Sequence, residues 1–131
     1  MTESGKRPSF AGMRDMNLSK GEMIMSKIKV IIKRPDEKIG HMTYISDTLE
    51  NLQKTVGGYI EVVPIDEKHV LVCNEEGKIQ NAHLVNFKMP YDTIVGTVFI
   101  CGVKGEEFDD IKMTRKEWAQ KLKEWGNDIE D

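Results

Sequence analysis

The residues best suited to chemistry in this sequence are three histidines and two cysteines. His41, His69 and His83 show neither the Cys-x-x-Cys pairs nor the His-x-x-x-His spacing that places several ligands on one metal ion. Cys73 and Cys101 lie in strand-like apolar runs, away from expected helix N-termini and from cationic neighbours that lower a thiol pKa. We therefore expect two reduced, buried cysteines, with no metal and no cofactor.

Paired carboxylates are the other feature that catalysis could use. They fall in polar segments where runs of charge are normally solvated surface, namely Glu75-Glu76, Glu106-Glu107 and Asp109-Asp110. No residue stands out as the general base that a hydrolase would need. The sequence therefore indicates a protein that is not an enzyme.

The segment Gly57-Gly58-Tyr59 has a composition that suits ligand binding. Two glycines let the backbone turn sharply and approach a ligand, and Tyr59 can stack on a base or ring. Glu61 points to the same face as Tyr59 by strand alternation. The segment follows an expected helix rather than opening one, so it does not resemble a dinucleotide phosphate cradle. An ordinary helix cap is the simpler explanation of the glycines.

Two neutral amides complete the candidate pocket. Asn74 and Asn86 carry donors and acceptors that can read polar edges of a ligand, although each is also an ordinary turn or strand residue. The candidate ligand-binding residues are Gly57, Gly58, Tyr59, Glu61, Asn74 and Asn86. The basic face of the last helix could also contact phosphate, although such faces mostly serve solubility.

The first elements that position these residues are a hairpin and a helix. A β-branched run at 28–33 and a weaker one at 39–45 predict two paired strands. An amphipathic helix follows, with Ser46 or Asp47 as its N-cap and Gly57 as a left-handed C-cap.

A second hairpin is predicted from strands at 59–63 and 69–73. We expect Gly77, with a positive φ, to close a turn into a short strand at 78–80, and 81–93 to form a loop.

The run 93–101 is apolar on both faces, which predicts a central strand with a bulge or a close backbone approach at Gly96. The acidic stretch 106–110 is expected to be a solvated connector.

The C-terminal helix is predicted from a capping box at Thr114 and Glu117. Trp118, Leu122 and Trp125 then form an apolar stripe along one face of this helix. The expected fold is therefore α+β: a mostly antiparallel sheet of about five or six strands, with one short helix and a C-terminal helix packed on it.

Length and charge exclude several classes of protein. The 131 residues suit one small domain with a tail, and a net charge of -3 offers no broad basic surface for nucleic acid or membrane. No apolar run approaches the roughly 20 residues that span a bilayer, and no secretory signal is recognisable. We expect a cytoplasmic protein.

The first 25 residues differ in composition from the rest of the chain. Residues 1–25 are predicted to be a flexible N-terminal arm or a translated leader, and 26–131 a single α+β domain. The leader hypothesis makes Met25 the natural start, because common codons for 20–22 spell a ribosome-binding sequence just upstream.

Several segments together resemble a known family. The runs 56–63 and 72–78, with Asn86 and the run 94–98, are similar to a domain-of-unknown-function family of small proteins carried by bacteriophages, prophages and plasmids. The resemblance covers 26–104 and leaves out the N-terminal tail and the last helix. It implies a mobile-element accessory protein made inside a bacterial host cell.

By analogy, many small phage proteins of this kind resemble counter-defence factors. The leading hypothesis is a non-catalytic binding protein that sequesters a small nucleotide-type immune signal, such as a cyclic nucleotide or an ADP-ribose-type molecule. The alternative is a protein-partner inhibitor of a host defence enzyme, whose acidic surface at 106–110 mimics nucleic acid. Either mode is compatible with a homo-oligomer formed through a sheet edge or the last helix.

Overall fold

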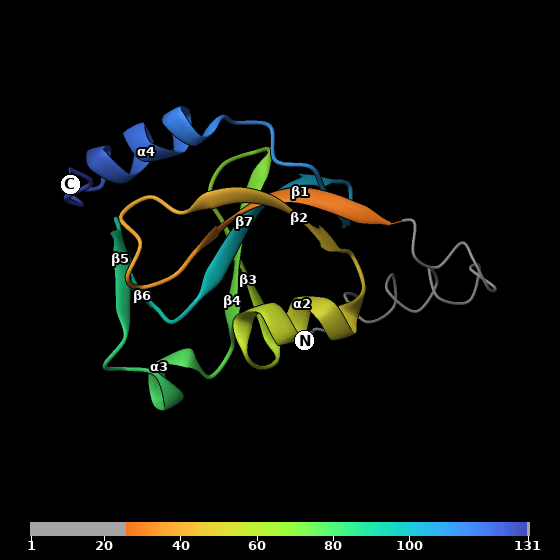
Figure 1. The fold of residues 1–131 in the computed structure, drawn as a ribbon, viewed down its shortest axis with the longest axis horizontal. Coiled ribbons are helices and arrows are strands. Elements are labelled where there is room, and N and C mark those ends of the chain that lie inside the picture. The colour runs from red at the N-terminus through yellow and green to blue at the C-terminus, as the bar shows by residue number, and fades with distance from the viewer. Residues whose placement is uncertain (1–25, 131) are drawn as a thin grey trace.

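An antiparallel sheet of six strands organises the chain in the computed structural model, which describes residues 26–130 (Figure 1). The strand order is β2-β1-β7-β4-β3, and the short β8 pairs with β7. A separate two-stranded sheet, a short helix and a C-terminal helix complete the predicted α+β fold. The expectation of an arm or a leader over 1–25 lies outside the described residues.

The first hairpin forms as predicted. Strands β1 (Lys27–Lys33) and β2 (His41–Ser46) pair antiparallel, and helix α2 (Leu49–Val56) follows. The predicted N-cap is wrong, because the helix begins later and the hydroxyl of Thr48 accepts the Asn51 amide. The C-cap prediction is confirmed by the φ of 86° at Gly57.

The second hairpin is also confirmed. Strand β3 (Ile60–Pro64) pairs antiparallel with β4 (His69–Asn74), and β4 lies inside the sheet between β3 and β7. The strand β3 forms one edge of the sheet, so among the described residues it has a strand partner on one side alone.

The segment after β4 differs from its prediction. Residues Gly77–Gln80 form a short helix, α3, because the amides of Gln80 and Asn81 bond back to the carbonyls of Glu76 and Gly77. The φ of Gly77 is not positive. The predicted short strand at 78–80 is therefore wrong.

The expected loop at 81–93 contains a strand and the start of another. Strand β5 (Val85–Met89) pairs antiparallel with β6 (Asp92–Val95) in the separate hairpin. The side chain of Phe87 is buried and anchors this hairpin in the core. Short polar segments with one buried aromatic residue carry too weak a periodic signal to reveal such strands.

The long apolar run at 93–101 is divided between two strands. It breaks at Gly96, whose φ is 74°, and β7 (Val98–Lys104) then runs through the middle of the large sheet. The central position is confirmed, whereas the single continuous strand is not. A Cβ at Gly96 would lie 3.3 Å from the side-chain Nδ2 of Asn81, so a close approach exists there but involves a side chain.

The acidic stretch is a strand in part, which corrects the prediction of a solvated connector. Strand β8 (Glu107–Asp109) pairs with the end of β7, and Phe108 is buried against Phe99. Helix α4 (Arg115–Glu124) begins at the predicted Thr114–Glu117 capping box.

Each face of the sheet buries its own core, because successive strand residues point to opposite sides. On one face α2 packs against β2, β3, β4 and β7, and its Leu52 and Val56 belong to the buried cluster there. On the other face α4 and the β5–β6 hairpin pack through Trp118, Leu122 and Phe87 (Figure 1). No helix within residues 26–130 is long and apolar enough to cross a membrane.

Candidate functional site

The predicted glycine pocket is a corner where the end of α2 meets the end of β4. Asn74 is buried there, and its Nδ2 donates to the Gly57 carbonyl at 3.3 Å and to Gln80 Oε1 at 3.1 Å. Its Oδ1 accepts the Glu76 amide at 2.8 Å. The Asn74 amide is therefore committed to holding the corner together rather than turned toward a ligand.

The two glycines leave room for the side-chain amide of Asn74. A Cβ on Gly58 would lie 2.8 Å from Asn74 Oδ1, closer than a side chain can approach, so any larger residue would displace Asn74. Tyr59 follows with its side chain 68% exposed, and its carbonyl accepts the Glu75 amide at 2.8 Å. The structure thus brings Gly57, Gly58, Tyr59 and Asn74 together, as the sequence analysis proposed.

A small hollow of about 140 Å³ opens beside this corner, between β3, α3 and β6. Its charged lining consists of Glu61, Glu75, Asp92 and Lys78, and the Lys78 ammonium pairs with the Asp92 carboxylate. Burial, reinforced by Glu61 and Asp92, raises the pKa of the Cys73 thiol in this hollow to about 12. The hollow, which we call the acidic hollow, therefore holds a protonated thiol and an excess of negative charge.

Asn86 is not part of this lining, which corrects the six-residue pocket. Its Nδ2 donates to the carbonyls of Lys33 and Gly96 at 2.8 and 2.7 Å, and its Oδ1 accepts the Lys33 ammonium at 2.6 Å. Lys33 is only 2% exposed and also donates to the Glu37 carbonyl at 2.7 Å. Burial lowers the pKa of Lys33 to about 8, although the Glu37 and Asp36 carboxylates oppose the shift. Asn86 thus supplies a hydrogen-bond acceptor to the buried ammonium of Lys33.

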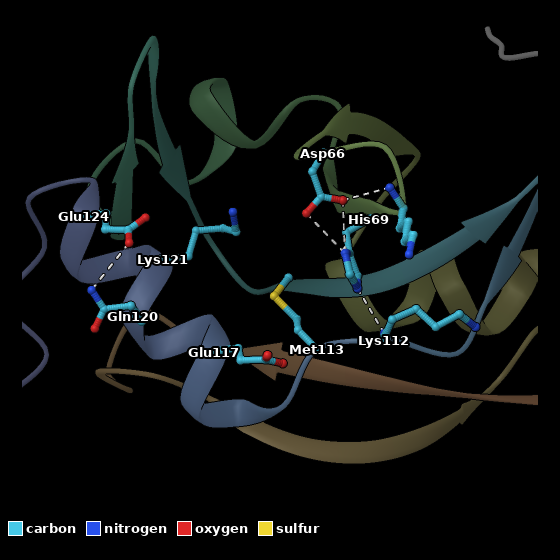
Figure 2. A pocket seen from close by; sticks show the side chains of 9 residues that line it. Asp66, His69, Lys112, Met113, Glu117, Gln120, Lys121 and Glu124 are labelled. Carbon is cyan, nitrogen blue, oxygen red and sulfur yellow. Dashed lines mark hydrogen bonds and ion pairs between the residues drawn. The ribbon is translucent and has the colours of Figure 1, made fainter.

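A larger groove of about 390 Å³ lies near the opposite end of the β3–β4 hairpin (Figure 2). The hairpin turn, the segment before α4 and one face of α4 enclose it. We call it the lysine groove, and it is lined by Asp66, Lys68, His69, Lys112, Met113, Glu117, Gln120, Lys121 and Glu124. Figure 2 shows Met113 between His69 and the helix.

His69 joins two parts of this groove. Its Nδ1 lies 3.1 Å from Asp66 Oδ1, and its Nε2 lies 3.0 Å from the Lys112 backbone nitrogen. Because a backbone amide can only donate, Nε2 is the acceptor and the ring proton sits on Nδ1, facing Asp66. His69 is 5% exposed, and the lone pair that a general base would use is already occupied.

The carboxylates of the lysine groove are engaged in internal hydrogen bonds. Burial alone would raise the pKa of Asp66, but bonds from the Lys68 amide and His69 outweigh burial and hold that pKa below its usual value. Glu117 accepts the Thr114 amide in the capping box, and Glu124 accepts from Gln120 at 3.4 Å.

The ammonium groups of the groove are less constrained. Lys112 pairs with Asp109 at 3.0 Å. The Nζ atoms of Lys68 and Lys121 make no hydrogen bond or ion pair with residues 26–130, and Lys121 lies 5.9 Å from the centre of the Trp125 ring. Two cationic groups are therefore available to an anion in the groove.

Sequence analysis did not identify this groove, although it noted the basic face of α4. The spacing of Asp66 and His69 across a polar turn was a usable signal, because residues three apart in a tight turn come within hydrogen-bond reach. The contact of His69 with Lys112 spans 43 positions and has no local signature.

Comparison with known proteins identifies a family for the chain. A family model described as "Domain of unknown function (DUF3846)" matches residues 28–124. The match runs to the end of α4, so the last helix belongs to the matched region, contrary to the expectation that the resemblance ends at 104. No curated protein and no solved structure matches the chain.

Proposed function

We propose that this chain, which belongs to the DUF3846 family, is a non-catalytic binding protein that captures a small nucleotide-type ligand in the lysine groove. One observation carries the proposal. The carboxylates of the groove are occupied by internal hydrogen bonds, whereas the ammonium groups of Lys68 and Lys121 make no hydrogen bond or ion pair within residues 26–130. Phosphate oxygens are the natural acceptors for such groups.

Size favours the groove over the acidic hollow for this ligand. Small-molecule sites usually enclose about 300–1,000 Å³. The groove has about 390 Å³ and the hollow about 140 Å³. The three carboxylates of the hollow would also repel phosphate, whereas the groove offers the ammonium groups of Lys68 and Lys121 to it.

The state of His69 supports capture rather than turnover. Its Nε2 accepts the hydrogen bond of the Lys112 amide, so the imidazole of the groove is held in a structural role. The ligand is therefore expected to leave the protein chemically unchanged.

The biological role belongs to the same proposal. The resemblance to proteins of phages, prophages and plasmids suggests action in the cytoplasm of a bacterial host, where capture of a cyclic nucleotide or ADP-ribose-type signal would blunt immunity. The alternative, an acidic mimic of nucleic acid at 106–110, has less support. Asp109 pairs with Lys112, Asp110 accepts the Lys29 amide, and Phe108 is buried.

The test is thermal unfolding of the purified protein against a panel of linear and cyclic nucleotides, including cyclised ADP-ribose forms. A ligand at one hundred times its dissociation constant adds about 2.7 kcal/mol of stability, which is readily measured in a small domain. Calorimetric titration then gives the affinity for the ligand that stabilises most, and chromatography shows whether it is recovered intact.

Matched variants locate the site. K68M and K121M together should weaken binding at least tenfold, because both phosphate contacts are lost while the aliphatic stems remain. K54M is the control, since Lys54 is exposed on α2, which packs on the other face of the sheet. The proposal would be rejected if no ligand of the panel raised the unfolding temperature, or if the double variant bound the ligand as tightly as the parent does. A chemically altered ligand would reject its non-catalytic part.

A further inference from the structure

We propose that the protein has a second binding surface, on which the open edge of β3 receives an extended segment of a protein partner that carries an arginine or lysine between apolar residues. The surface consists of β3, the acidic hollow and the exposed apolar side chains around it. It is separate from the lysine groove, so the two proposals stand or fall independently.

The edge of the sheet supplies the backbone of this surface. Strand β3 pairs with β4 alone among the described strands, and Ile60, Val62 and Val63 are only half-buried. An edge strand presents unpaired N–H and C=O groups that a further strand can satisfy. Pro64 lacks an N–H and ends the strand, so the added segment would pair over 60–63.

The stretch of chain that includes this edge also carries most of the exposed large apolar side chains. Among residues 26–130 the large apolar side chains that are exposed are Tyr44, Tyr59, Ile79, Leu84, Val85 and Tyr91. All but Tyr44 fall within residues 59–91, the stretch of chain from the start of β3 to the start of β6. Such a concentration on a small domain is typical of an interaction surface.

Three of these residues are close neighbours of residues that line the acidic hollow. Tyr59 bonds through its carbonyl to Glu75, which lines the hollow. Ile79 and Tyr91, 84% and 99% exposed, are each next in sequence to a lining residue. Tyr59, Ile79 and Tyr91 therefore lie close to the rim of the hollow.

Charge decides what occupies the surface. The lining holds three carboxylates, on Glu61, Glu75 and Asp92, against the single ammonium of Lys78. A volume of about 140 Å³ suits the head of one side chain. A guanidinium or ammonium fits both the size and the sign, whereas nucleic acid would be repelled. Tyrosine and arginine are also the residues that most often dominate protein interfaces.

The probe for this surface is a library of random heptapeptides that is selected for binding to the purified protein. The enriched sequences are then synthesised as free peptides. We expect enrichment of peptides with one Arg or Lys flanked by apolar residues, and at least a tenfold weaker affinity when that residue is replaced by Gln. Fluorescence polarisation of labelled peptides measures both affinities.

Variants of the protein provide the matched controls. E61K should abolish peptide binding and E61Q should weaken it about fivefold, with unfolding temperatures unchanged because Glu61 is exposed. E50K, an equivalent charge reversal on the exposed face of α2, should bind as the parent does. K68M with K121M should also leave peptide binding unchanged.

Three results would overturn the inference. The first is a library that yields no basic position, and the second is unaltered binding by E61K. The third is a dimer of the free protein, detected by light scattering, that E61K dissociates, because a second copy of this chain would then be the occupant.

Discussion

Replacement of Lys33 by Met should change how the free energy of unfolding depends on pH. Lys33 is almost fully buried, donates to Asn86 and Glu37, and lies 5.4 Å from the centre of the Phe87 ring. Burial lowers its pKa from 10.5 to about 8 in the folded protein. Below pH 8 the ammonium is charged in both states, so the fold carries the full cost of burying it.

The sign and size follow from these two pKa values. Between pH 8 and 10.5 the folded protein has released the Lys33 proton while the unfolded chain still binds it, so stability rises with pH. By pH 10 the parent should gain about 2.5 kcal/mol relative to pH 7, at roughly 1.4 kcal/mol for each pKa unit. K33M has no such group and should not show this gain.

A second group titrates in the same pH range, and its effect on the free energy of unfolding must be cancelled. The Cys73 pKa is raised to about 12 by burial, so above pH 9 the thiol ionises in the unfolded chain first and stability falls. Because both proteins keep Cys73, the difference between their unfolding free energies removes its effect. At pH 7 that difference should be small, since relief of the buried charge opposes the unpaired oxygens of Asn86 and Glu37.

The assay is urea unfolding followed by tryptophan fluorescence at pH 7, 8, 9 and 10 for both proteins. The expected result is a difference that shifts by about 2.5 kcal/mol in favour of the parent between the first and last pH. K54M provides the control for an exposed lysine and should track the parent. A difference constant to within about 0.5 kcal/mol would refute the argument that burial disfavours the charged form of Lys33.

Two further predictions concern the fold and are checked by the same urea titrations. G40A should cost at least about 2 kcal/mol, because φ is 103° and the new Cβ would lie 2.6 Å from the Ile32 carbonyl oxygen. G105A, at φ 64° in open space, should cost only about 1 kcal/mol, and equal losses would contradict the steric argument. W118A should cost about 3–5 kcal/mol, since Trp118 is fully buried and donates to the Ile39 carbonyl. A loss under about 2 kcal/mol would show that the core collapses around the site.

Several elements were predictable because their signals are local. The β-branched run of β1 predicted the first strand, and the left-handed cap at Gly57 ended the first helix as expected. The Thr114–Glu117 capping box fixed the start of α4, because both of its hydrogen bonds join residues three apart.

The misassigned segments share a different property. The helix at Gly77–Gln80 depends on the corner set by Asn74, and the β5–β6 hairpin depends on burial of Phe87 against α4. The interruption at Gly96 separates two strands whose apolar residues form one continuous run in the sequence. Tertiary contacts decided each of these, and a pattern over a few residues does not contain them.

The candidate sites divide in the same way. The sequence predicted a pocket of six residues, of which Gly57, Gly58, Tyr59 and Asn74 meet at one corner, because a helix cap and the end of a neighbouring strand define that corner. It could not reveal that Asn86 serves Lys33, a contact between residues 53 positions apart. The lysine groove likewise exists only where a hairpin turn, the segment before α4 and the helix itself meet. Local hydrogen bonding and periodicity are written in neighbouring residues, whereas the shape and charge of a binding surface arise only when distant segments pack together.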